Sequence, residues 1–111
     1  MRLPNGDRAM VDIRKLREYC LSTTHRRGRH KARVFEGALG LTARDAEVLR
    51  TALLQAARTG DTVKSGEHDS HGRRYILDFP WTWLGRQATI RSAWIIRPNE
   101  DFPRLTSCYV L

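Results

Sequence analysis

Apolar residues in the first half of the chain recur at helical spacing. Two such patterns, over residues 13–21 and 29–39, are separated by the helix-breaking segment STTHRRG. Asp12 is placed to cap the first helix, and Gly40 is placed to end the second. The expected inward faces are Ile13, Leu16 and Cys20 in the first helix and Ala32, Phe35 and Leu39 in the second.

A third and longer helix is predicted over residues 43–58. Thr42 and Asp45 have the spacing of a capping box, in which each side chain bonds the backbone N–H of the other residue. The apolar positions lie on one side of this helix, as expected of a helix packed against a core. They are Ala46, Leu49, Leu53 and Ala56.

Strand-forming residues dominate the second half. Strands are predicted in RRYILDF, ATIRSAWIIRP and RLTSCYVL, while residues 60–72 are polar and turn-rich. The NG/GD turn in the opening LPNGDRAMVD indicates a small hairpin or an edge strand. We therefore expect an α+β fold, in which N-terminal helices pack against a three- to four-stranded antiparallel sheet. A chain of 111 residues suits a single domain, residues 1–111.

The chain is strongly basic, with 20 Lys and Arg against 12 Asp and Glu and a net charge of +8. The only lysines are Lys15, Lys31 and Lys64. The other basic residues are arginines, whose planar guanidinium group suits bidentate contact with phosphate. A preference for arginine codons explains the choice of arginine equally well, but it does not explain the charge. We expect an anionic partner, and no membrane association, because no apolar run approaches membrane-spanning length. The start lacks the apolar part of a signal peptide, which favours a cytoplasmic location.

Neither cysteine lies at metal-ligand spacing. Cys20 is on the apolar side of a predicted helix and Cys108 is in a predicted strand, so buried free thiols are favoured over a disulfide. The segment EHDSHG, residues 67–72, is favoured as a polar turn over an opportunistic metal site. We expect no cofactor and no metal.

The densest charge lies in HRRGRHKARVF, residues 25–35, which runs from a loop into the first turns of a helix. Free N–H groups at a helix N-terminus attract phosphate, and basic side chains around them deepen the positive potential. The alternative is a solvated basic loop with no binding role. The nucleic-acid-binding candidates are Arg26, Arg27, Arg29 and Arg33.

Two histidines in this segment add possible chemistry. Metal-independent RNA cleavage needs a base for the 2′-hydroxyl proton, cations around the phosphorane and an acid for the leaving 5′-oxygen. His25, His30 and Lys31 supply side chains of these kinds, since an unperturbed histidine titrates near pH ~6.5. Arg91, on the expected exposed face of its strand, could hold a phosphate, and Thr106 or Tyr109 could lend a hydroxyl.

The aromatic residues of the second half have two interpretations. Trp94 and Tyr109 are favoured as core residues. Trp81 and Trp83 lie between predicted strands, where they either stack on nucleic-acid bases or pack in a loop against the sheet.

Three segments together resemble a known family: YCLSTTHRRGRHKARVFEGALGLT, the opening RLPNGDRAMVDIRKLREY and the end DFPRLTSCYVL. They look like a bacterial domain-of-unknown-function family with the pattern hydrophobic-x-N-x-x-H-P-x-G-[KR]-x-K-A-x-x-F, over essentially the whole chain. Arg26 stands where the pattern has proline, and residues 22–24 stand where it has Asn-Pro-Glu, so the departures concern the rigidity that the resemblance implies for the loop, while the loop stays basic. His30 lies at a variable position. The matching positions are His25, Gly28, Lys31, Ala32 and Phe35.

The resemblance implies a biological setting. Members of that family occur as small free-standing proteins and as C-terminal modules of toxin-like or phage-related proteins, which implies toxin–antitoxin or toxin–immunity pairs. The order of helices and strands is also similar to the barnase, EndoU, colicin and RelE group of small metal-independent ribonucleases. In several of those, a basic helix with His or Lys faces a sheet that carries Arg, Ser or Thr.

Two functional hypotheses follow. The first is a metal-independent ribonuclease-type toxin that cleaves RNA, with tRNA as the expected class, and is neutralised by a small acidic antitoxin or immunity protein. His25 is then acid or base with His30 as its substitute, Lys31 and Arg91 stabilise the phosphate, and Thr106 is a supporting hydroxyl. The second is a non-catalytic basic module that binds nucleic acid or protein within a toxin–antitoxin or defence system.

Overall fold

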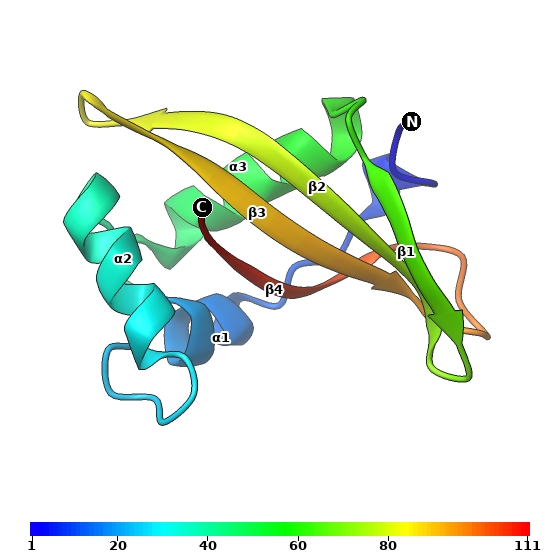
Figure 1. The fold of residues 1–111 in the computed structure, drawn as a ribbon, viewed down its shortest axis with the longest axis horizontal. Coiled ribbons are helices and arrows are strands. Elements are labelled where there is room, and N and C mark those ends of the chain that lie inside the picture. Colours follow the sequence, from blue (N-terminus) through cyan, green and yellow to red (C-terminus); the bar gives the residue numbers. More distant parts are fainter.

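A computed structural model describes all 111 residues and shows helices on one side of a four-stranded antiparallel sheet (Figure 1). The expected α+β class is confirmed, with helices first and the sheet second. The longest helix, α3 (Ala46–Thr59), lies behind the middle of the sheet, while α2 (Arg29–Leu39) lies beside the end of β4 (Arg104–Val110). None of the helices combines the length and the apolar composition that spanning a bilayer requires.

The first two helices form close to the predicted positions. Helix α1 (Ile13–Lys15) begins where the Asp12 carboxylate accepts the backbone N–H of Arg14 at 2.9 Å. It continues as a π-helical turn, Leu16–Cys20, closed by the bond from the Leu21 N–H to the Leu16 carbonyl. Helix α2 covers residues 29–39 as predicted and ends at a left-handed Gly40, with φ of 69°. All three of its expected inward residues are buried.

The third helix is preceded by the predicted capping box between Thr42 and Asp45. Because these two residues fix the first turn as the short helix η3 (Ala43–Asp45), α3 begins at Ala46. Its predicted stripe is buried in full, and this stripe covers the sheet.

The sheet is a simple meander in the order β1-β2-β3-β4, with β1 (Lys64–Asp69), β2 (Gly72–Trp83) and β3 (Arg86–Ile96) before β4. A two-residue turn joins β2 to β3. Leu84 and Gly85 both have positive φ, of 48° and 79°, as a type I′ turn requires.

Three expectations about the loops were wrong. The opening residues form neither the expected hairpin nor an edge strand: they contain the short helix η1 (Gly6–Arg8) and a single parallel bridge from Met10 to Arg104. Residues 60–72 include β1, an edge strand whose side chains are all exposed, so it carries no apolar pattern. Trp81 and Trp83 belong to β2 rather than to a loop, because the I′ turn lies beyond them.

The core lies between α3 and the inner face of the sheet. Trp94 is 1% exposed, and its indole Nε1 donates to the Ser92 hydroxyl at 2.9 Å. Cys20 and Cys108 are buried free thiols, as predicted. Contact with the Cys20 thiol, and then burial, raises the pKa of Cys108. The core thus joins the N-terminal helical segment to the last strand.

Candidate functional site

The loop before α2 holds His25 in a defined orientation. The backbone N–H groups of Arg27 and Gly28 donate to the His25 Nδ1 at 3.0 and 3.1 Å. The backbone N–H of His25 in turn donates to the Ser22 hydroxyl at 3.1 Å, and the ring packs edge-on against Tyr19. Because Nδ1 accepts two N–H bonds, the proton of the neutral ring lies on Nε2. His25 is therefore held as a hydrogen-bond donor.

Gly28 allows this loop to close. A Cβ at this position would collide with the Tyr19 carbonyl oxygen. The glycine therefore lets the loop pack on the preceding helical turn while its N–H reaches His25.

His25 lines a hollow of about 390 Å³ together with Lys15 and Thr106. The Lys15 Nζ donates to the Thr106 carbonyl at 3.5 Å. The Thr106 hydroxyl donates to the Ala93 carbonyl at 3.1 Å, which leaves its oxygen lone pairs free to accept. The other lining residues are Asp12, Arg14, Glu18 and Tyr19. One loop, one helix and one strand thus place an imidazole, an ammonium and a hydroxyl around one space.

The charges around this hollow are mixed. Hydrogen bonds from Arg14 lower the pKa of Asp12, which stays ionised and matched by the guanidinium. Glu18 makes no ion pair, and neither does Lys15. An anionic group entering the hollow meets Lys15 and His25, which both line it.

A second cluster lies on the outer face of the sheet. The Lys31 Nζ sits over the Tyr109 ring, 4.3 Å from its centre, and Tyr109 is the cross-strand neighbour of Arg91. Arg91 makes two bonds of 2.8 Å to the Asp78 carboxylate. These bonds lower the pKa of Asp78 and raise that of Arg91. Arg91 therefore meets a phosphate only in competition with Asp78.

The remaining basic candidates are exposed and unpaired. His30 lies in the first turn of α2 with no hydrogen-bond partner, and no side chain caps this helix. None of the four candidate arginines forms an ion pair, so their charge is available to a ligand. These four are Arg26, Arg27, Arg29 and Arg33.

The structure thus divides the predicted site. His25 and Thr106 share the hollow, whereas Lys31 and Arg91 meet at Tyr109, and Arg91 does not line the hollow. Lys15 was not foreseen, because in the sequence it is one lysine on the polar side of a short helix. Its separation from Thr106 is 91 residues, so no local pattern marks the pair.

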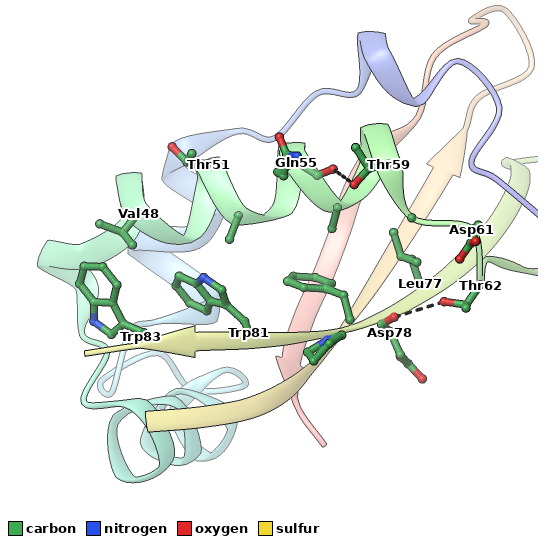
Figure 2. Close-up of a pocket in the computed structure, with 15 residues that line it drawn as sticks. Val48, Thr51, Gln55, Thr59, Asp61, Thr62, Leu77, Asp78, Trp81 and Trp83 are labelled. Carbon is green, nitrogen blue, oxygen red and sulfur yellow. Dashed lines mark hydrogen bonds between the residues drawn. The ribbon is translucent and has the colours of Figure 1, made fainter. Parts of the chain in front are cut away.

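The largest cavity lies elsewhere, between α3 and the second half of β2 (Figure 2). Trp81 and Trp83 line it and stack on each other, with ring centres 5.9 Å apart. No histidine, lysine or arginine lines it. This cavity therefore lacks the basic side chains that characterise the His25 hollow and the arginine cluster.

The fold and the hollow define a small basic α+β domain that carries a His–Lys pocket beside an unpaired arginine cluster. The chain belongs to the DUF6883 family, a domain of unknown function whose family model matches residues 2–111. The expected membership of a domain-of-unknown-function family is thereby confirmed. No curated protein matches the sequence.

Among solved structures, the fold is similar to a chain of a contact-dependent growth inhibition toxin–immunity protein complex from Klebsiella pneumoniae 342. The TM-score is 0.71 at 15% sequence identity, and the match covers 91% of this chain and 98% of the other. At this identity the likeness concerns the fold.

Proposed function

We propose that this domain is a toxin that cleaves RNA without a metal ion, with tRNA as the expected class of substrate. The observation that carries the proposal is the hollow in which His25, Lys15 and Thr106 meet, next to arginines with no acidic partner. The shared fold with a chain of a toxin–immunity complex supports the toxin setting. The net charge of +8 suits an RNA substrate. We propose that the toxin acts on this RNA in the cytoplasm.

The proposed reaction is transesterification. The 2′-oxygen attacks phosphorus and loses its proton to a base, while the bond to the 5′-oxygen breaks and that oxygen gains a proton. His30 does not line the hollow, but it is exposed in the first turn of α2 and both of its ring nitrogens are unpartnered, so we propose it as the base. Lys15 or Lys31 supplies the proton to the leaving oxygen.

His25 takes a different role in this scheme from acid or base. Its Nδ1 is engaged by two backbone N–H groups, so the ring presents a fixed Nε2–H. A preorganised donor of this kind stabilises charge that develops on a phosphate oxygen. Thr106 accepts a hydrogen bond from the substrate, since its own proton is used.

We further propose a small acidic immunity protein or antitoxin as the partner. It would cover the arginine cluster, because opposite charges on two surfaces both speed association and exclude RNA.

One observation favours the alternative of a non-catalytic nucleic-acid-binding module. Asp78 binds Arg91 in a bidentate manner, so Arg91 is not free to hold a phosphate. Nucleic-acid binding through the four unpaired arginines alone does not require Arg91.

The test is incubation of the purified protein with total bacterial RNA in EDTA, beside His25→Ala, His30→Ala and Lys15→Ala. We expect discrete fragments from the wild type, and a loss of at least about 100-fold for His30→Ala. His68→Ala is the matched control, because His68 is an exposed histidine on β1. Intact RNA from a folded wild-type sample that still binds RNA would establish the binding module instead.

A further inference from the structure

Strand β2 is much longer than the edge strand that pairs with it. Pairing with β1 extends along β2 only as far as Ile76, which pairs with Lys64, the first residue of β1. From residue 77 to Trp83, β2 pairs with β3 on one side and with no strand on the other. The second half of β2 is therefore a free sheet edge.

The orientation of this edge follows from one contact. The Thr62 hydroxyl donates to the Asp78 carbonyl at 3.5 Å, from the side away from β3. Backbone groups alternate along a strand, so Pro80 and Thr82 point the same way as Asp78. Pro80 has no N–H, which is tolerated only where no ladder bond is lost. The edge thus offers the N–H of Asp78 and Thr82 and the carbonyls of Pro80 and Thr82.

A groove of about 720 Å³ runs beside this edge. Figure 2 shows Trp81 and Trp83 rising from β2 toward α3, with Thr51 and Gln55 along the flank of the helix. Since side chains alternate between the two faces of a strand, a strand added at this edge would direct every second side chain into the groove.

The chemistry of the groove selects its occupant. No Lys or Arg lines it in a protein of net charge +8, and Asp61 is its only carboxylate that is not ion-paired, since Arg91 binds the Asp78 carboxylate on the other face of the sheet. An apolar recess beside unpaired backbone N–H and carbonyl groups suits an uncharged chain that pairs through its own backbone.

We infer that this edge binds an extended segment of a partner protein, which adds to β2 as a strand and places uncharged, apolar side chains at alternate positions in the groove. Backbone pairing supplies affinity and the groove supplies selectivity. The inference concerns a different surface from the His25 hollow and does not rest on the proposed ribonuclease activity.

The probe is a synthetic peptide of about nine residues, Val at odd and Thr at even positions, flanked by one lysine at each end. It is titrated into the ¹⁵N-labelled protein. We expect shifts of the Trp81 and Trp83 indole N–H signals and of the Asp78 and Thr82 amides, with the amides of the 25–35 segment unmoved. No shift at about 1 mM peptide overturns the inference. If an RNA oligonucleotide shifts the Trp81 and Trp83 indole signals and the peptide does not, the groove is a base-stacking site and the inference is wrong.

Two N-methylated peptides test strand pairing itself. Methyl groups on the Val or on the Thr nitrogens block opposite edges of the peptide. We expect one series to abolish binding and the other to retain it. Equal binding by both would show an apolar ligand without strand addition.

Variants of exposed residues complete the test. Thr82→Pro removes one edge N–H and should weaken peptide binding about two- to tenfold, whereas Thr82→Val keeps that N–H and should not. Gln55→Arg places a long cation at the groove and should abolish binding. Arg58→Gln, on α3 but outside the groove, is its control. Unchanged binding in both Thr82→Pro and Gln55→Arg contradicts the inference.

Discussion

The backbone N–H of Gly28 points at the Nδ1 of His25 from 3.1 Å. This contact orients the imidazole and selects its tautomer, since Nδ1 must carry a lone pair to accept the bond. It also ties the loop to α2, because Gly28 is the residue before the first turn of that helix. The local backbone, rather than a neighbouring carboxylate, sets the chemistry of His25.

Gly28→Ala should therefore destabilise the protein. The added methyl group meets the Tyr19 carbonyl and pushes the loop outward, at a cost of about 1–3 kcal/mol in the free energy of unfolding. Urea denaturation measures this cost, and ¹⁵N shifts of the imidazole report loss of the single tautomer. Gly37→Ala is the control. No atom lies within 4 Å of its Cβ position in α2, so it should stabilise by about 0.5–1 kcal/mol. Equal effects of the two changes would contradict the packing of Gly28.

The arginine cluster should govern the salt dependence of RNA binding. Replacing Arg26, Arg27, Arg29 and Arg33 with Gln removes up to four phosphate contacts, so the slope of log K against log salt should fall by up to about 3. Filter binding of single-stranded RNA at several salt concentrations measures the slope. A control with the same change of net charge replaces Arg44, Arg58, Arg73 and Arg97. An equal loss of slope in both variants would show that total charge, not the cluster, binds RNA.

The Arg91–Asp78 pair should make stability depend on pH in acid. The pair lowers the pKa of Asp78 below its ordinary value of 3.8, so its contribution is present above that pH and is lost as pH falls through the lower, folded value. Asp78→Asn should thus be less stable than the wild type at pH 7. The difference in urea midpoint should close as the pH falls below 3.8. A difference that stays constant into strong acid would mean that the carboxylate charge does not contribute.

Two serines whose hydroxyl groups are buried should respond in opposite ways to truncation. Ser92 donates to the Leu77 carbonyl at 2.7 Å and accepts from the Trp94 indole. Ser92→Ala leaves that indole unpaired and should cost about 1–3 kcal/mol in the free energy of unfolding. The Ser107 hydroxyl is buried without a partner, so Ser107→Ala should be neutral or stabilising. Thermal and urea unfolding measure both changes, and a larger loss for Ser107→Ala would reverse this assignment.

The helices could be predicted because their determinants are local. The apolar face of α2 and its end at Gly40 follow from residue spacing and from one left-handed position. β1 was missed because every one of its side chains is exposed, so no alternation marks it. The second half of β2 was mistaken for a loop because the turn residues Leu84 and Gly85 resemble no common hairpin pair.

The candidate site was predicted only in part. The sequence singled out His25 because histidine in a basic segment is conspicuous, but it gave no means of choosing a tautomer. The bonds that choose it come from backbone N–H groups, whose directions are absent from a residue pattern.

The three helices, the sheet that follows them, the charge of +8 and its concentration before α2 can all be derived from the sequence, because periodicity, capping and composition act within a few residues. Three relationships depend on the folded chain: Lys15 contacts Thr106 across 91 residues, Asp78 binds Arg91, and β2 extends beyond its edge partner β1. Contacts of this kind depend on strand register and packing, which many distant residues set together.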